Sequence, residues 1–316
     1  MKALFLDGSE ARVRDHPEPE PADGHAVVRV RMAGVCNTDL ELVKGYMGFR
    51  GVLGHELVGE VEDGPDAWRG RRVACEINFA CGACETCARG LARHCPTRRV
   101  MGIQQADGAL AELVRVPVEN LHAVPDALTD ERAVFTEPLA AAFEILEQVR
   151  VEPGTACLVL GDGKLGLLAA QVLDAAGAKV RVVGHHEDKL AILARRGIET
   201  VLERDWQPAP TELVIEATGT AKGFAAALAT TRPRGTLVLK STVAEHPDVD
   251  LAPLVIHEIQ VMGSRCGPFA PALEALASGA IDVASLVSDG VPLARAEEAL
   301  ERAARPGALK VLVDAG

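Results

Sequence analysis

The chain has 316 residues, a formal net charge of −12 and a sequence pI near 5.3. At this charge nucleic acid is not an expected partner, because duplex binding requires Lys and Arg side chains to neutralise phosphates. No apolar stretch follows a basic N-terminus, and charged residues interrupt the most apolar window, residues 156–183. We therefore expect a cytoplasmic protein with neither a signal peptide nor a membrane span.

Up to about residue 135, the sequence contains short β-like segments separated by Gly, Pro and Asp turns. These segments are residues 2–6, 26–32, 57–62, 71–75 and 111–116. They predict an irregular, β-rich first domain.

Three motifs in this half combine a metal-ligand residue type with a hydrogen-bonding neighbour: Cys36-Asn-Thr38-Asp39, Gly54-His55-Glu56 and Thr136-Glu137. Taken singly, Cys36 is equally compatible with a buried thiol, His55 with a core histidine and Glu137 with a helix-start carboxylate. Together with the motifs below, they indicate a metal site separate from the cysteine loop.

Four cysteines lie at spacings of two, two and seven residues: Cys81, Cys84, Cys87 and Cys95. Zinc held by four thiolates needs a short, tight loop, which two-residue gaps supply. An iron–sulfur cluster is one alternative, but ferredoxins of this pattern place the fourth cysteine after three residues. Disulfides are the other alternative, and a reducing compartment disfavours them. We predict a structural zinc site.

After about residue 135, apolar strands alternate with helical stretches. Strands are predicted over residues 156–160, 179–183, 212–217 and 236–240, with helices from about 164 and 188 and over 221–230. This alternation predicts right-handed βαβ units in a parallel sheet. From about residue 270, one or two helices and a last strand over 309–313 complete the chain.

A glycine-rich motif stands at the first strand-to-helix turn of this half: Gly161-Asp162-Gly163-Lys164-Leu165-Gly166. A buried strand precedes it and a helix follows it, which is the context of the dinucleotide fingerprint. The glycines permit the turn, the close approach of a pyrophosphate and the packing of helix on strand. The pyrophosphate is expected at the helix N-terminus, where unpaired N–H groups meet its charge.

Taken in order, these motifs resemble those of the zinc-containing medium-chain dehydrogenase/reductase superfamily, which includes the alcohol, polyol and threonine dehydrogenases. The resemblance covers essentially the whole chain. It implies an α/β fold with a β-rich, GroES-like catalytic domain over residues 1–137, to which residues 270–316 return. It also implies a Rossmann domain with a doubly wound parallel sheet over residues 138–269.

By the same resemblance, Cys36, His55 and Glu137 hold a catalytic zinc. Glu56 is a nearby carboxylate able to enter the coordination sphere. The Cys81–Cys95 loop holds a structural zinc, so two zinc ions per chain are expected. A zinc ion with an open coordination position acts as a Lewis acid toward an alcohol oxygen.

The resemblance also suggests a proton path. The Thr38 hydroxyl would take the proton of the alcohol and pass it to the cofactor ribose, and Asp39 would fix the tautomer of His55. Many relatives end this relay with a histidine five positions after the cysteine ligand, where this chain has Glu41. Either Glu41 takes that role or the proton leaves through water, and Glu41 is equally compatible with a solvated surface residue.

The expected function is hydride transfer between a small-molecule alcohol, such as a secondary alcohol or polyol, and NADP or NAD, giving the ketone or aldehyde. Two alternatives are a zinc-free enoyl or quinone reductase of the same fold and a non-catalytic cofactor-binding protein, since fold does not prove activity. Relatives are dimers or tetramers, so a homodimer or homotetramer is expected.

Cofactor choice depends on the end of the second strand of the nucleotide-binding half. NAD-preferring domains carry an acidic residue there, about twenty residues after the glycine motif. In this chain the position is Gly184, which is expected to leave room for a 2′-phosphate, with His185, His186 or Lys189 as donors. Glu187 serves NAD if the strand ends later. NADP is favoured over NAD.

Overall fold

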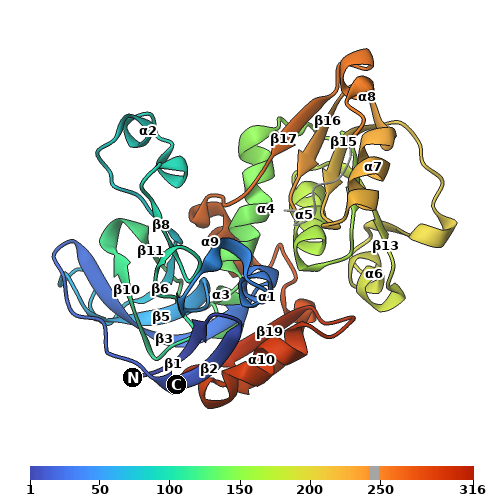
Figure 1. Ribbon diagram of the computed structural model, residues 1–316. Coiled ribbons are helices and arrows are strands. Elements are labelled where there is room, and N and C mark those ends of the chain that lie inside the picture. Colours follow the sequence, from blue (N-terminus) through green and yellow to red (C-terminus); the bar gives the residue numbers. More distant parts are fainter. Residues whose placement is uncertain (242–248) are drawn as a thin grey trace. The chain divides into compact units, whose positions relative to one another are not determined.

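The computed structural model describes residues 1–241 and 249–316, and the chain divides into two compact units. Unit 1 comprises Met1–Glu137, Phe269–Gly279 and Val283–Gly316, and unit 2 comprises Pro138–Pro268 and Ala280–Asp282 (Figure 1). None of the helices in the described ranges is long and apolar enough to cross a membrane.

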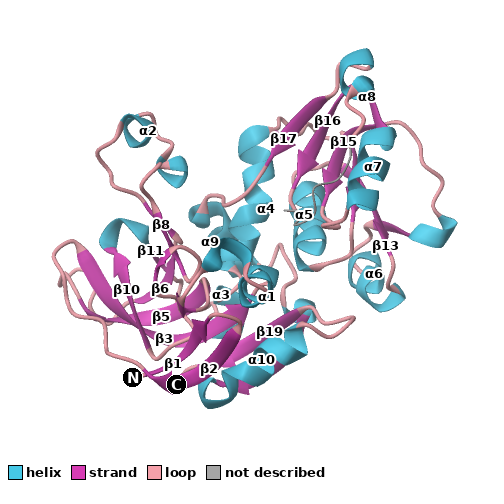
Figure 2. Cartoon of the chain, viewed as in Figure 1, coloured by secondary structure: helices cyan, strands magenta, loops and turns pink. Residues whose placement is uncertain are grey.

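Unit 1 consists mainly of β-strands, drawn in magenta in Figure 2. Its largest sheet has the order β11-β6-β5-β3-β19-β18, with β10 also paired to β3. Its strands are β3 (His25–Val35), β5 (Glu56–Asp63), β6 (Arg72–Cys75), β10 (Leu113–Pro117), β11 (Leu121–Ala123), β18 (Val287–Pro292) and β19 (Lys310–Asp314). Strand β19 pairs antiparallel with β3, so the end of the chain completes a sheet begun near its start.

Two smaller sheets, five α-helices and several short 3-10 helices complete unit 1. One sheet has the order β2-β1-β4 and contains β1 (Lys2–Asp7), β2 (Glu10–Asp15) and β4 (Gly51–Val52). The other contains β7 (Asn78–Phe79), β8 (Arg99–Met101) and β9 (Gln105–Ala106). The helices are α1 (Asn37–Val43), α2 (Glu85–Ala88), α3 (Asp130–Ala133), α9 (Phe269–Ser278) and α10 (Ala296–Ala303).

Unit 2 is built on a parallel sheet of order β14-β13-β12-β15-β16-β17. Its strands are β12 (Ala156–Leu160), β13 (Lys179–Gly184), β14 (Glu199–Leu202), β15 (Thr211–Glu216), β16 (Thr231–Leu239) and β17 (Gln260–Gly263). Its helices are α5 (Lys164–Ala175), α6 (Glu187–Ala194), α7 (Ala221–Thr230) and α8 (Ala252–Ile256), and α4 (Thr136–Gln148) enters it from unit 1.

Numbered within the sheet, these strands have the order 3-2-1-4-5-6, which is that of the doubly wound dinucleotide-binding fold. Side chains on successive strands, such as Leu158, Val183, Val214 and Leu237, pack into one apolar cluster. The predicted fold class, a parallel α/β sheet together with a β-rich unit, is confirmed.

Candidate metal and cofactor sites

Cys36 lies immediately before helix α1, where extended backbone becomes helical. Its N–H donates to Asp39 Oδ2 at 2.8 Å, so Asp39 caps the start of the helix. Asp39 is fully buried, and its other carboxylate oxygen accepts from the Gly54 N–H at 3.2 Å. The two hydrogen bonds of Asp39 therefore fix the backbone at the start of α1, and with it the position of Cys36.

His55 follows the tight turn at Gly54, where strand β5 begins. Gly54 has a φ of +97°, and a side chain there would place its Cβ 2.7 Å from the Leu110 nitrogen. His55 Nδ1 lies 3.4 Å from Asp39 Oδ1, so the predicted Asp39–His55 pair is an ion-pair contact rather than a short hydrogen bond. The same carboxylate thus contacts both the Cys36 segment and the His55 ring.

A lysine that no sequence motif indicated balances the charge of Glu56. Lys310, the first residue of β19, forms an ion pair with Glu56 Oε2, and its Nζ also lies 3.4 Å from the Val35 carbonyl oxygen. Both partners are buried, Lys310 being 1% exposed and Glu56 0%. A side chain at Gly34 would collide with the Glu56 carboxylate, so glycine there makes room for the pair.

Burial and neighbouring charge act against each other on the ionisable groups of this cluster. Burial alone would raise the pKa of the Cys36 thiol, but His55 lowers it overall. Burial alone would lower the pKa of His55, but Asp39 and Cys36 raise it well above its ordinary value. Burial would also lower the pKa of the Lys310 amine, and Glu56 raises it. The cluster therefore favours the Cys36 thiolate, the form that binds a metal.

The structure brings Cys36, His55 and Glu56 together, with one ligand atom of each lying within 4.8 Å of the others. Glu56 Oε1 is buried and accepts no hydrogen bond from the described residues. A thiolate, an imidazole nitrogen and a carboxylate oxygen are zinc ligands, so these side chains fit the expected ion. Glu137 is outside this group; it lies in the first turn of α4, and its charge contributes to the raised pKa of Lys310.

The two residues considered for proton transfer have different surroundings. Thr38 Oγ1 lies 3.7 Å from Cys36 Sγ, beside the metal-ligand cluster. Glu41 forms an ion pair with Lys44 at 2.8 Å, and its side chain is 42% exposed. Glu41 therefore lies at the surface as an ion-paired, partly solvated residue.

The four cysteines of the second motif converge in space. Tetrahedral zinc with bonds of about 2.3 Å places its sulfurs about 3.8 Å apart. The Sγ separations are 3.5 Å for Cys84–Cys87, 3.6 Å for Cys81–Cys95, 3.9 Å for Cys84–Cys95 and 4.0 Å for Cys81–Cys87. A disulfide requires about 2.05 Å, and all eight cysteines are free. The four thiols therefore fit one zinc ion.

Replacing Cys84 or Cys87 with serine is expected to lower the melting temperature by about 10 °C, because a structural thiolate site contributes folding free energy. Differential scanning calorimetry measures this shift. Thr86→Ala in the same loop keeps all four thiols and is expected to melt close to wild type. A Cys84→Ser protein that keeps full stability but loses turnover would reverse the roles of the two metal sites.

The glycine motif has the strand–turn–helix context that was predicted. It joins β12 to α5, with Gly163 at the N-cap of the helix. Gly161 has a φ of +114°, and a side chain there would place its Cβ 2.6 Å from the Ala217 carbonyl oxygen. A side chain at Gly166 would collide with the Gly161 carbonyl oxygen, whereas the space beside Gly163 is open. These features fit a dinucleotide pyrophosphate lying over Gly163.

Asp162, the second residue of the motif, fills the space beside Gly184. A side chain at Gly184 would place its Cβ 2.5 Å from Asp162 Cβ. Asp162 Oδ2 accepts from the N–H groups of His185 and His186, at 2.8 and 2.7 Å, and lies 3.0 Å from His186 Nδ1. The expectation that Gly184 leaves room for a phosphate is therefore wrong, because Asp162 occupies that room.

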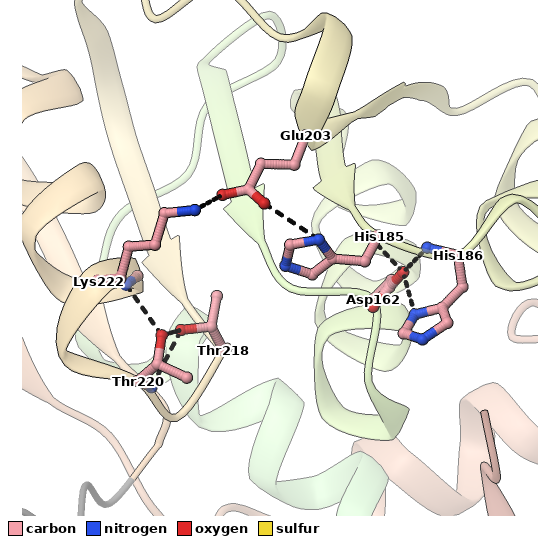
Figure 3. Close-up of polar contacts among 8 residues, drawn as sticks. Asp162, His185, His186, Glu203, Thr218, Thr220 and Lys222 are labelled. Atoms are coloured by element: carbon pink, nitrogen blue, oxygen red, sulfur yellow. Dashed lines mark hydrogen bonds and ion pairs between the residues drawn. The ribbon is translucent and has the colours of Figure 1, made fainter. Parts of the chain in front are cut away.

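A cavity of about 420 Å³ lies beyond the carboxyl ends of β13 and β14. Its lining residues are His185, Leu202, Glu203, Arg204 and Lys222. Figure 3 shows the Glu203 carboxylate between His185 and Lys222. Of the residues predicted to contact a 2′-phosphate, only His185 is in this lining, and Lys189 is buried in α6.

Two family models match this chain. The alcohol dehydrogenase GroES-like domain matches residues 22–126, and the zinc-binding dehydrogenase domain matches residues 165–278. The chain belongs to the zinc-containing medium-chain dehydrogenase/reductase superfamily. The first match includes Cys36, His55 and the four-cysteine loop. As a member of this superfamily the chain is an alcohol- or polyol-type oxidoreductase that uses zinc and a nicotinamide cofactor.

Similar proteins align with this dehydrogenase over nearly its full length. A D-arabitol-phosphate dehydrogenase of Enterococcus avium is 29% identical, over 94% of this chain and 91% of that protein. An alcohol dehydrogenase of Thermus sp. ATN1 is 30% identical, with a TM-score of 0.90 and coverage of 99% of both chains. A zinc-binding dehydrogenase of Sinorhizobium meliloti 1021 bound to NADP is 27% identical, with the same TM-score and coverage.

Several site residues of this dehydrogenase were not indicated by any motif. Lys310 was detectable in principle, as a single cation preceding the apolar run 311–313 of β19. Glu203 and Arg204 come directly after the short strand β14, and Lys222 lies in the first turn of α7. Neither segment carries a recognised sequence motif. Only the fold brings them to one cavity.

Proposed function

We propose that this dehydrogenase interconverts a secondary alcohol of the polyol class and the corresponding ketone, with NADP favoured over NAD. The observation that carries the proposal is the cluster of Cys36, His55 and Glu56, in which His55 and Glu56 are buried and Cys36 is half-buried, in a chain whose second unit contains a dinucleotide turn. Polyol chemistry is supported by the similarity to the Enterococcus avium D-arabitol-phosphate dehydrogenase.

We propose that Cys36, His55 and Glu137 hold the catalytic zinc, and that Glu56 stays with Lys310 until it is needed as a replacement ligand. Bound there, zinc supplies Lewis acidity that favours deprotonation of the alcohol. The Thr38 hydroxyl, beside Cys36, takes the substrate proton at Oγ1 and passes its own proton toward the cofactor ribose.

The four-cysteine loop is proposed to hold a second, structural zinc, giving two zinc ions per chain. Because thiolate sites require reduced cysteines, we also propose a cytoplasmic location. Metal analysis of the purified protein gives the ratio directly: about two zinc ions per chain are expected.

NADP is proposed because His185, Arg204 and Lys222 place three cationic or protonatable side chains around the cavity that follows β13 and β14. The last residue of β13 is Gly184 rather than an acidic residue, although the Asp162 carboxylate lies beside it and accepts from the His185 and His186 N–H groups. The NADP-bound Sinorhizobium meliloti relative supports this choice.

We propose a closed homo-oligomer, a dimer or tetramer, formed through the β17 edge of the parallel sheet. Strand β17 has a neighbour on one side only among the described strands. Apolar side chains are exposed on it, on α8 and on the residue before α8: Val261, Val255, Ile256 and Leu251. Sedimentation equilibrium at micromolar concentration is expected to give the mass of two or four chains, and a single-chain mass would contradict this assembly.

A substrate screen tests the activity itself. Polyols, simple secondary alcohols and polyol phosphates are incubated with zinc-loaded protein and NADP or NAD, and the absorbance of the reduced nicotinamide is followed. Oxidation of at least one polyol class is expected. Reduction of enones or quinones by zinc-depleted protein, without oxidation of any alcohol by the loaded protein, would contradict the proposal.

A further inference from the structure

The end of β14 places a carboxylate next to His185. Strands β13 and β14 pair in parallel with Gly184 opposite Leu202, so the residues that follow them, His185 and Glu203, lie side by side. Glu203 Oε2 lies 3.0 Å from His185 Nδ1. Doubly wound sheets bind their ligands at the carboxyl ends of the strands, where the adenosine ribose meets the end of the second strand.

The other oxygen of the same carboxylate contacts a lysine from a third element. Lys222, in the first turn of α7, donates to Glu203 Oε1 at 2.9 Å (Figure 3). The Glu203 side chain is 32% exposed, against 81% for Lys222 and 64% for His185. The hydrogen bond from Lys222 lowers the pKa of Glu203 although burial opposes this, so the carboxylate form is favoured.

The remaining cation of the cavity already has carboxylate neighbours. Arg204 Nη2 lies 2.7 Å from Glu187 Oε1, and its Nε lies 3.6 Å from Asp205 Oδ2. Each fixed cation lining the cavity therefore faces an acidic side chain. Asp162, the acidic residue of the glycine motif, already accepts hydrogen bonds from the His185 and His186 N–H groups.

These contacts set up a competition at the adenosine ribose. A 2′-phosphate would need hydrogen bonds from Lys222 and His185, which Glu203 now accepts. It would also lie close to the negative charge of the Glu203 carboxylate, which repels it. A 2′-hydroxyl carries no charge and can donate to the same carboxylate. Glu203 therefore opposes NADP and supports NAD, although the other side chains of the cavity attract a phosphate.

We infer that Glu203 is the residue that determines the ratio of NADP to NAD affinity in this dehydrogenase. It competes with the 2′-phosphate for Lys222 and His185 and accepts a hydrogen bond from the ribose 2′-hydroxyl of NAD. The inference rests on the proposed function, in that the adenosine ribose must bind at the carboxyl ends of β13 and β14.

The test measures dissociation constants of NADP and NAD by calorimetry, on the full-length zinc-loaded protein without substrate. Glu203→Gln removes the charge and keeps the shape. It is expected to tighten NADP about tenfold and to weaken NAD by no more than about threefold, as expected for one partly exposed charge. Lys222→Met is expected to weaken NADP about tenfold and leave NAD nearly unchanged.

Glu199→Gln is the matched control. Glu199 is the first residue of β14, the strand that precedes Glu203; it pairs with Arg181 at the surface and does not line the cavity. An equal shift in the NADP-to-NAD ratio for Glu199→Gln, or no shift for Glu203→Gln, would overturn the inference. The wild-type ratio alone tests the proposed NADP preference: a protein that prefers NAD refutes that preference, while the change on Glu203→Gln still decides the role of Glu203.

Discussion

The Cys36→Ser variant is expected to lose turnover about 10³-fold or more while binding the nicotinamide cofactor within about twofold of wild type. A serine hydroxyl does not ionise as readily as a thiol, so it is a poor zinc ligand. Loss of Lewis-acid stabilisation worth several kcal/mol corresponds to about three decades in rate. Cofactor affinity is retained because the glycine motif lies in the other unit.

Steady-state kinetics and cofactor titration measure the two effects separately, and His55→Ala is expected to behave in the same way. Cys75→Ala is the control, because Cys75 is a buried thiol of unit 1 that belongs to neither metal-ligand group. It is expected to keep its turnover. Near-normal turnover by zinc-depleted Cys36→Ser protein would refute the proposed mechanism.

Replacing Lys310 with methionine is expected to destabilise the protein by about 3–5 kcal/mol, because Glu56 would remain as a buried charge without its partner. Urea unfolding, followed by circular dichroism, measures the change in the free energy of unfolding. The double variant Lys310→Met with Glu56→Gln removes both charges and is expected to recover most of the loss.

Lys44→Met provides the comparison for an exposed ion pair. Lys44 pairs with Glu41 at the surface, and its loss is expected to cost at most about 1 kcal/mol. If Lys310→Met unfolds at the same urea concentration as wild type, Glu56 is not held by Lys310 and its proposed role as a reserve ligand loses its basis.

The site residues that the sequence predicted belong to short, contiguous motifs. Cys36, Thr38 and Asp39 lie within four residues of one another, and the four-cysteine loop closes on itself within one segment. The glycine motif likewise spans a single turn between β12 and α5. Within each motif local geometry constrains the residue types, whereas the grouping of Cys36, His55 and Glu137 into one zinc site was implied by the family resemblance.

The missed features depend on pairings between distant segments. Lys310 meets Glu56 across 254 residues, because β19 and β5, which carry them, both pair with β3. Strands β14 and β17 were not predicted because both are four-residue strands at the two edges of the sheet. An edge strand that is partly exposed lacks the continuous apolar run that marked β12 and β15.

The error at Gly184 has the same origin. Its spacing from the glycine motif was interpreted correctly as the end of β13, but the sequence did not show that Asp162 would fill the adjacent space. The cavity itself could not be predicted without β14, since Leu202, Glu203 and Arg204 all come from the end of that strand and the turn after it.

The most direct test of the catalytic zinc site is an anomalous X-ray diffraction map, recorded at the zinc edge, of crystals of active protein. Two peaks per chain are expected. One should lie among the thiols of Cys81, Cys84, Cys87 and Cys95, and the other should contact Cys36 and His55, with Glu137 as the third ligand. A fully active protein with a peak at the four thiols and none at Cys36 and His55 would contradict the proposed catalytic site.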